Sequence, residues 1–325
     1  MATQPAVTLF VPTWNAGPEF PEILGRMQNQ RLDRPFEVLI IDSGSTDGTV
    51  EFLRRQPVRL IEIPRVEFNH GLTRALGIRE SRGEIVVLTV QDARPVDDRW
   101  MQGLVDAFAD AGVAGAYSRQ IPRSDANPFV RARLEGWLAA ADAPRVQRVA
   151  TRTDFEALSP IEKLQRVGFD NVSSSVRRSV ALDIPFRECR FGEDLDWAYR
   201  VLLAGHTIVY EPRSCVIHSH NHSLWYEFKR VYLDHRNLQR LLGMRTVPRF
   251  PDVVWRTAGG AVHLFRAVAT DTSLSLGGRV NWWSRVIPHS FAQTLAQYLG
   301  ARSSNRALSR SSLFRWVDRL LGRGV

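Results

Sequence analysis

A carboxylate and a group of histidines are the first sign of metal chemistry in this sequence. Asp92 directly follows an apolar run in "VVLTVQD", and His218, His220 and His222 are spaced by two in "VIHSHNHS". In an extended segment, residues spaced by two face the same side. Carboxylate oxygens bind Mg²⁺ or Mn²⁺, and imidazole nitrogen also suits Mn²⁺. A single histidine is usually a core or surface residue, but three within five positions favour a metal site.

Two adjacent carboxylates, Glu193 and Asp194, open the segment "EDLDWAYR". A carboxylate close to an acceptor hydroxyl can act as a general base, and a second carboxylate beside it raises its pKa into a useful range. Acidic residues also stabilise the first turn of a helix. That structural interpretation is strong for Asp196 and fair for Glu193, so the residues alone leave both interpretations open.

Alternating strands and helices must position these residues. Buried β-branched runs predict strands, and apolar residues at helical spacing between them predict helices. This alternation is typical of an α/β fold with a mostly parallel sheet flanked by helices. The predicted strands span 7–15, 37–45, 58–63, 84–92, 113–121 and 207–212, and the predicted helices span 17–30, 46–56, 69–83, 96–112 and 192–206. A helix followed by a long loop is expected from 121 to about 168, and a helical, basic chain beyond 223.

Polar residues follow three of the predicted strands where each strand ends. They are Thr13 and Asn15, Asp42 and Ser43, and Gln91 and Asp92. Ligands of open α/β sheets bind at the carboxyl ends of strands, so these side chains should meet at one edge. Asp42 could accept a hydrogen bond from a nucleobase, although a turn or cap role explains it equally well. No G-x-G-x-x-G or G-x-x-x-x-G-K-[ST] motif occurs, which argues against dinucleotide and P-loop enzymes.

Composition is that of an ordinary globular protein, with 325 residues, 44% of them hydrophobic and 24% charged. No apolar run is long enough to span a membrane, and no leader pattern precedes the first strand, so a cytoplasmic location is expected. Two cysteines fit a reducing compartment. The formal charge of +9 comes almost wholly from arginine, whose guanidinium suits phosphates. No nucleic-acid-binding motif accompanies it.

The last residues, 309–325, combine apolar residues with arginines at the spacing of an amphipathic helix. Such a helix packs on the rest of the chain or on a second subunit, or it lies in the interface of a membrane. The membrane interpretation places the protein on the inner face of the cytoplasmic membrane.

Four ordered motifs resemble glycosyltransferase family 2, whose members have the Rossmann-like GT-A fold. The motifs are "FVPTWN", "VLIIDSGSTDGT", "NHGLTRALGIRESRGEIVVLTVQDARP" and "FGEDLDWAYRVLLAGHTIVYEP", and they extend from residue 6 to about 222. "FNHG" with Arg74, and "VQDARP", further resemble bacterial rhamnosyltransferases, which use dTDP-L-rhamnose. The resemblance implies an inverting transfer of a sugar, L-rhamnose in this branch, to a hydroxyl of a growing bacterial surface glycan.

The resemblance also implies which residues bind the donor. These would be Thr13, Asn15, Asp42, Ser43, His70, Arg74, Gln91 and Asp92. Within this set, Thr13 and Asp42 would contact the nucleobase, and Arg74 would neutralise charge on the diphosphate.

A divalent cation and a base complete the implied site. Asp92 would bind Mg²⁺ or Mn²⁺, with His218 as the first imidazole ligand and His220 as the second. Asp194 occupies the base position of the family, beside Glu193. Val90 departs from the pattern, because it stands where many members have the first carboxylate of a D-x-D motif.

Two regions are expected: a catalytic part, 1–222, and a helical C-terminal part, 223–325. The donor site would lie in 6–120, and the acceptor and base region in 121–222. The partners would be a nucleotide-diphosphate sugar and a glycan or lipid-linked glycan. One alternative is the same fold with a UDP-sugar donor, and another is an inert nucleotide-sugar or glycan-binding protein, which Val90 favours. A nucleotidyltransferase is disfavoured because "PTWNAGPEF" has no Arg or Lys.

Overall fold

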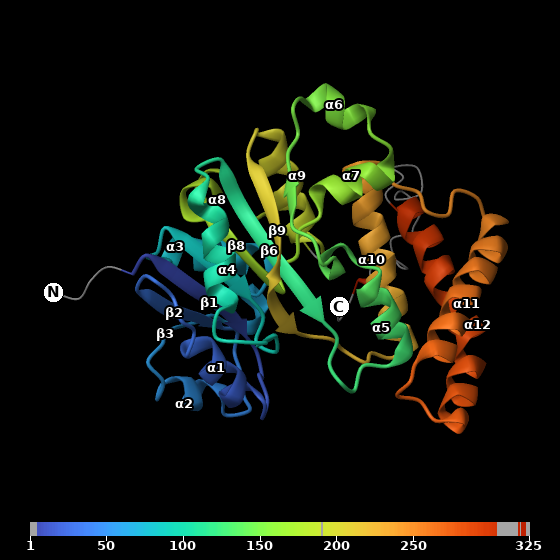
Figure 1. Cartoon of the computed structure of the whole chain (residues 1–325), viewed down its shortest axis with the longest axis horizontal. Coiled ribbons are helices and arrows are strands. Elements are labelled where there is room, and N and C mark those ends of the chain that lie inside the picture. The colour runs from blue at the N-terminus through green and yellow to red at the C-terminus, as the bar shows by residue number, and fades with distance from the viewer. Residues whose placement is uncertain (1–4, 190, 304–317, 319, 323–325) are drawn as a thin grey trace.

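A nine-stranded mixed sheet forms the centre of the molecule in the computed structural model, which describes residues 5–189, 191–303, 318 and 320–322. The strand order is β3-β2-β1-β4-β8-β6-β9-β5, and β7 pairs with β9 off this path. The strands are β1 (Val7–Thr13), β2 (Phe36–Asp42), β3 (Arg59–Glu62), β4 (Ile85–Thr89), β5 (Arg94–Pro95), β6 (Val113–Ile121), β7 (Arg145–Gln147), β8 (Ser173–Arg177) and β9 (Thr207–Ile217). Figure 1 shows the sheet between layers of helices.

Helices connect the strands and then continue as a separate group at the C-terminal end. Those connecting the strands are α1 (Phe20–Gln28), α2 (Thr49–Leu53), α3 (His70–Glu80), α4 (Trp100–Asp106), α5 (Pro128–Glu135), α6 (Arg152–Ala157), α7 (Pro160–Val167), α8 (Arg178–Asp183) and α9 (Glu193–Leu203). The C-terminal group is α10 (Leu224–Leu242), α11 (Asp252–Thr270) and α12 (Leu276–Ser303).

The predicted mostly parallel sheet is confirmed, and its physical basis lies in the apolar strands. All five residues of β4 are buried. Val86 and Leu88 face the core under α3, α8 and α9, whereas Ile85 and Val87 face the core under α1 and α4. A strand buried on both faces reads as a continuous apolar run. β1, β2, β3 and β4 pair in parallel, whereas β8 runs antiparallel to both β4 and β6.

The prediction of a long loop before residue 168 is wrong, because much of that segment forms β7, α6 and α7. Ser159 and Glu162 form a capping box at the start of α7, which satisfies free backbone N–H groups there. Phe155, Leu164 and Val167 are buried in the main core. Local capping and these few apolar residues therefore fold a segment whose overall composition suggested a loop.

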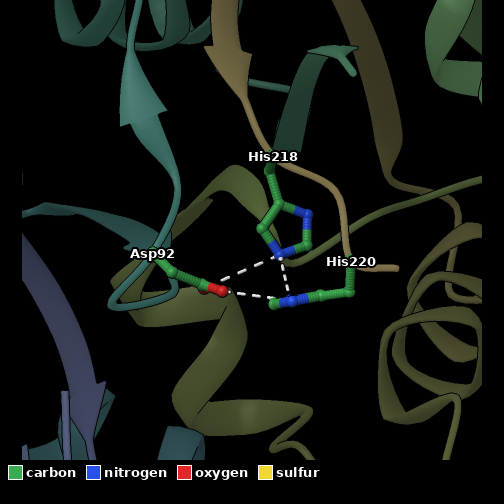
Figure 2. Close-up of side chains that lie close together, drawn as sticks. All are labelled: Asp92, His218 and His220. Atoms are coloured by element: carbon green, nitrogen blue, oxygen red, sulfur yellow. Dashed lines mark hydrogen bonds and ion pairs between the residues drawn. The ribbon is translucent and has the colours of Figure 1, made fainter. Parts of the chain in front are cut away.

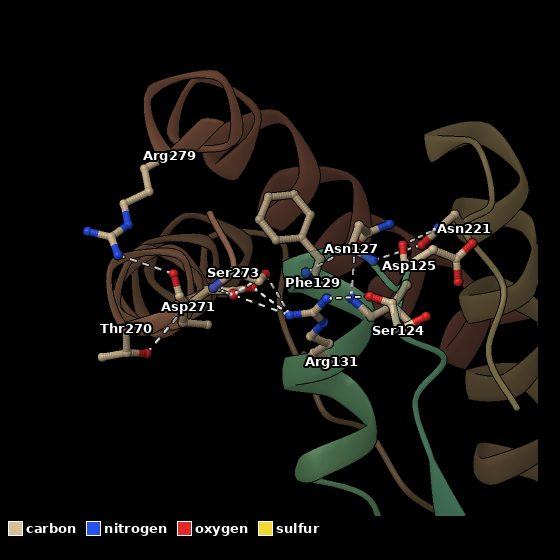
Figure 3. A network of polar contacts seen from close by, with 12 residues as sticks. Ser124, Asp125, Asn127, Phe129, Arg131, Asn221, Thr270, Asp271, Ser273 and Arg279 are labelled. Carbon is tan, nitrogen blue, oxygen red and sulfur yellow. Dashed lines mark hydrogen bonds and ion pairs between the residues drawn. The ribbon is translucent and has the colours of Figure 1, made fainter. Parts of the chain in front are cut away.

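The α11–α12 pair lies at the end of the molecule farthest from β3 (Figure 1). A polar network joins its turn to α5 (Figure 3): Arg131 Nη1 lies 3.2 Å from Asp271 Oδ2 and donates to Ser273 Oγ at 2.9 Å. Beside it, the Asn127 backbone N–H donates to Asn221 Oδ1 at 2.9 Å. The turn of the pair is therefore held close to the segment that follows β9.

None of the described helices is long and apolar enough to cross a membrane. The amphipathic helix expected over 309–325 lies outside the described residues, apart from 318 and 320–322.

Candidate active site

Asp92, His218 and His220 converge on one point at the carboxyl edge of the sheet (Figure 2). Asp92 follows β4, and both histidines lie in the irregular segment after β9. His218 Nε2 is 3.6 Å from Asp92 Oδ1, and His220 Nε2 is 3.0 Å from Asp92 Oδ2. The two Nε2 atoms are 3.1 Å apart. One carboxylate and two imidazoles within 4.8 Å of one another form a donor set that suits Mn²⁺ or Mg²⁺.

A chain of hydrogen bonds behind His218 fixes which of its nitrogens faces this point. Gln120, in β6, donates its amide to Asp170 Oδ2, so its carbonyl oxygen faces His218 Nδ1 at 3.2 Å. A carbonyl oxygen only accepts, so Nδ1 carries the proton and the Nε2 lone pair faces Asp92. Such a second partner orients an imidazole for metal binding.

The charges of this group also suit a cation. Burial alone would raise the pKa of Asp92, but the hydrogen bond from His220 and the charges of His218 and His220 lower it to about 2. Burial lowers the pKa of His218 to about 4, although the charge of Asp92 opposes this. Near neutral pH, Asp92 is therefore ionised and His218 is neutral, the forms in which each binds a metal.

The predicted diphosphate residue Arg74 pairs with the predicted catalytic residue Glu193. Arg74 Nη1, on α3, lies 2.9 Å from Glu193 Oε1 at the start of α9, and the two side chains are only 5% and 9% exposed. Burial would raise the pKa of Glu193, but the charges of Arg74 and His70 outweigh it and lower the pKa. Arg74 therefore joins α3 to α9 in this structure and offers little guanidinium surface to a ligand.

Asp194 lies next to this pair but in the opposite electrostatic situation. Burial raises the pKa of its carboxyl well above the ordinary value, and the charges of Glu193 and Asp170 add to the shift. The backbone N–H of Leu195 donates to Asp194 Oδ1 at 2.8 Å. The neighbouring carboxylate acts in the expected direction, with burial as the larger cause. Asp196 instead pairs with Arg200 at 2.9 Å, as its helical interpretation predicts.

The loops after β1 and β2 hold each other through Asp42. Its two oxygens accept from Thr13 Oγ1 at 2.9 Å, from the backbone N–H of Ser45 at 2.8 Å and from Ser45 Oγ at 2.6 Å. Asn15 donates its backbone N–H to Ser45 Oγ and accepts from the backbone N–H of Thr46. Asp42 and Ser43 have no exposed surface. They therefore support the loops here rather than face a ligand directly.

Trp14, Gln91 and Arg65 form a more exposed surface at the carboxyl edge of the sheet, which we call the Trp14 wall. Gln91 accepts from the Trp14 backbone N–H at 2.8 Å and donates back to its carbonyl at 3.2 Å. The guanidinium of Arg65 lies 4.0 Å from the centre of the Trp14 ring. Trp14 is 44% exposed, so it offers an aromatic surface. Trp197, by contrast, is fully buried against Phe186 in the core.

His70 begins α3 beside this wall. Asn69 caps the helix by accepting from the backbone N–H groups of Gly71 and Leu72. A Cβ on Gly71 would lie 1.8 Å from the carbonyl oxygen of Arg187, so only glycine fits. Burial lowers the pKa of the His70 imidazole. The "FNHG" motif therefore fixes the start of α3 against a distant backbone.

A cavity of about 570 Å³ lies beside His222, between α5 and the C-terminal helices. Phe129 and Trp282 supply aromatic walls, with ring centroids 5.2 Å apart. One stripe of α12 supplies hydroxyl and amide groups at helical spacing, from Ser290, Gln293, Thr294 and Gln297. The predicted acceptor region, 121–222, thus contributes α5 and His222, but the C-terminal helices contribute most of the lining.

Sequence reasoning missed Gln120 and Asp170. Gln120 lies near the end of the predicted strand 113–121, and Asp170 lies shortly before β8. Trp137 Nε1 also donates to Asp170 Oδ2, at 3.2 Å. Polar residues at the ends of β6 and before β8 were the available signal, yet only the folded chain brings them behind His218.

Comparison with known proteins agrees with this architecture. Residues 8–170 match the model of glycosyl transferase family 2. A Salmonella anatum protein named O-antigen chain rhamnosyltransferase WbaN is 31% identical over 318 residues, covering 95% of this chain and 94% of that protein. RfbN of Salmonella typhimurium, with the same descriptive name, is 29% identical over 314 residues, covering 95% and 93%. A Mycobacterium tuberculosis N-acetylglucosaminyl-diphospho-decaprenol L-rhamnosyltransferase is 30% identical over 234 residues, covering 65% and 75%.

The chain therefore belongs to glycosyl transferase family 2, and its mixed sheet flanked by helices is GT-A-like.

Proposed function

We propose that this glycosyltransferase moves L-rhamnose from dTDP-L-rhamnose to a hydroxyl of a bacterial surface glycan, with inversion. The observation that carries the proposal is the alignment over 95% of the chain with relatives named O-antigen chain rhamnosyltransferases. The mycobacterial relative, whose name specifies a diphospho-decaprenol acceptor, supports an acceptor carried on a lipid diphosphate.

Asp92, His218 and His220 would hold a divalent cation at the diphosphate of the donor. The close approach of their ligand atoms and the proton position on His218 support this role. When bound, the cation would stabilise negative charge on the departing nucleoside diphosphate. Asp42 would act as a positioning residue, because its hydrogen bonds hold the loop of Ser45 and Thr46 at the donor side.

Asp194 would remove the proton from the attacking acceptor hydroxyl. A general base works best with a pKa near the operating pH, and burial with two neighbouring carboxylates shifts the pKa of Asp194 upward. Glu193 would position α9 through Arg74 instead of touching substrate, because its side chain is buried in that ion pair.

The cavity beside His222 would receive sugar rings of the acceptor. Its volume, about 570 Å³, lies within the range of small-ligand sites. Aromatic walls and neutral hydroxyl and amide groups match the alternating apolar faces and hydroxyls of a sugar. Gln293→Ala should therefore raise the KM for the acceptor and leave donor binding unchanged.

Thermal-shift titration of the full chain against dTDP-L-rhamnose, UDP- and GDP-sugars, with and without Mn²⁺, tests the donor assignment. A ligand that binds only the folded state raises Tm by mass action. The proposal predicts the largest shift with dTDP-L-rhamnose and its loss in Asp92→Asn. A larger shift with a UDP-sugar would overturn the choice of donor but keep the reaction class.

An inert binding protein is the second candidate, and Val90 is the observation that favours it. Residue 90 is a valine, so the first position of the D-x-D motif supplies no carboxylate to a sugar donor. Its side chain packs instead against the core under α1 and α4. Binding of dTDP-L-rhamnose without transfer to any lipid-linked glycan from bacterial membranes would support this candidate over the enzyme.

A further inference from the structure

The outer side of the α11–α12 pair is an exposed apolar surface without a partner among the described residues. Along α11, Val254, Ala258, Val262 and Phe265 are exposed at spacings of three and four, so they form one stripe. Along α12, the corresponding stripe contains Leu276, Val280, Ile287 and Phe291, which are also exposed. We call these two stripes, together with Phe250 and Trp255, the outer apolar face.

Two contacts join α12 to α11 and to a residue shortly before it. Trp283, between Val280 and Ile287 on the α12 stripe, donates its Nε1–H to the carbonyl of Phe265 at 3.3 Å. At the other end, the ring of Phe250 lies 5.7 Å from that of Tyr298. The cavity residues of α12, such as Gln293, lie on a different side of that helix. None of the residues of the two stripes lines the cavity, so the apolar stripes lie away from the side of the pair that faces it.

The apolar side chains of the outer apolar face have large solvent-exposed fractions for a surface that faces only water. Trp255 is 78% exposed, Leu276 74% and Val254 68%. Contiguous exposed apolar surfaces of this kind mark contacts with proteins or membranes. Leaving these side chains in water forfeits the free energy that their burial would supply.

The charge of this region distinguishes between two possible partners of the outer apolar face, a second copy of the chain and an anionic surface. From residue 245 to 302 the sequence has seven arginines and two aspartates, with no lysine or glutamate. Both aspartates are paired, Asp252 with Arg249 and Asp271 with Arg131. Arg256 and Arg285 line the cavity, but the segment as a whole remains cationic, so a two-fold contact with a second copy would bring two cationic segments together. An anionic surface instead matches both the charge and the apolar area.

We propose that the outer apolar face lies on an anionic lipid bilayer, with the α11–α12 pair parallel to the membrane plane. Trp255 and the aliphatic side chains would enter the boundary of the acyl chains, while arginines contact phosphate head groups. This surface differs from the segment 309–325 and does not depend on which nucleotide sugar is the donor.

Co-sedimentation of the full chain with vesicles tests the proposal. Wild type should bind vesicles of phosphatidylglycerol and phosphatidylethanolamine, and bind vesicles of phosphatidylcholine alone at least about tenfold more weakly. Binding should fall when NaCl is raised from about 0.1 M to about 0.5 M. The variant Val254→Ser/Val280→Ser should lose about tenfold in partition, because it removes two apolar contacts with the acyl region.

A double variant with the same substitutions at a different place on the surface is the control. Val66→Ser/Val146→Ser makes the same chemical change at valines that are 89% and 61% exposed elsewhere, and should bind vesicles as wild type does. Equal loss in both variants, or no binding of wild type to anionic vesicles, would overturn the proposal. So would sedimentation equilibrium showing a wild-type dimer that Val254→Ser/Val280→Ser converts to monomer. Both variants should keep the wild-type Tm and the wild-type shift of Tm on donor addition, which shows that a loss of vesicle binding is not a loss of folding or of donor binding.

Discussion

Asp92, in the turn after β4, and Asp194, at the start of α9, are both half-buried carboxyls, yet their pKa values move in opposite directions. Burial raises both. At Asp92 the neighbours are imidazoles, which reverse the effect. At Asp194 the neighbours are Glu193 and Asp170, which strengthen it. The difference teaches that the charge of the neighbours, more than burial, separates a cation site from a proton-accepting site.

The two centres are also joined. Gln120 bonds to His218 on one side and to Asp170 on the other, and Asp170 contributes to the raised pKa of Asp194. Each centre can therefore be altered alone, or both through the residue between them.

The largest expected effect is at the proton-accepting centre. Asp194→Asn should lower the rate of transfer by about 10²–10⁴-fold, the usual contribution of a general base, and leave the donor-induced thermal shift intact. Asp196→Asn is the matched control in the same helical turn and should keep most of the activity, because Asp196 pairs with Arg200. Equal losses in the two variants would remove Asp194 from the role of base.

The cation centre should respond through binding as well as rate. Asp92→Asn removes the charged ligand, so transfer should fall about 10²–10³-fold and Mn²⁺ should no longer enhance the donor-induced shift. Isothermal titration with Mn²⁺ and dTDP measures this directly. Asp98→Asn, at a half-buried aspartate paired with Arg31, should behave as wild type. Undiminished metal dependence in Asp92→Asn would contradict the assignment.

Breaking the link between the centres should have a smaller effect. Gln120→Leu removes the acceptor for His218 Nδ1, so the affinity for Mn²⁺ should fall about 10–100-fold. Gln102→Leu is the control, at a half-buried glutamine that donates to Asp106 and accepts from the backbone N–H of Asp33. Mn²⁺ affinity that is the same in both variants would mean that Gln120 does not orient the imidazole.

The smallest effect is a pH dependence of stability. The pKa of Asp194 is raised in the folded state, so its contribution to stability is full at low pH and is lost as pH rises through that value. Asp194→Asn cannot ionise and should therefore gain stability relative to wild type as pH rises from about 5 to about 8. A Tm difference of a few degrees that widens with pH is expected, and one that narrows would refute the sign.

The strand ends were predictable from sequence because parallel strands bring their carboxyl ends to one edge. That rule predicts Asp92 at the same edge of the sheet as Thr13 and Asp42. The approach of His218 and His220 to Asp92 is confirmed as geometry, whereas their role as ligands remains a prediction.

Other features depend on contacts that local patterns do not encode. Arg74 and Glu193 are 119 positions apart, and their ion pair forms only when α3 and α9 pack together. The histidines were expected in an extended segment after a strand, and they do follow β9, which ends at Ile217. They converge because an irregular segment turns toward Asp92, a geometry that the period-two spacing did not predict.

The position of β8 between β4 and β6 has a consequence for how the chain is made. β6 ends at Ile121, whereas β8, which separates it from β4, begins at Ser173. At a synthesis rate of about 5–20 residues per second, the ribosome needs roughly 3–10 s to make the missing strand. Until then β4 and β6 each present an unpaired edge, the kind of surface that recruits other strands. The strand that joins β4 to β6 is thus made only about midway through translation, after β1, β2, β3 and β4.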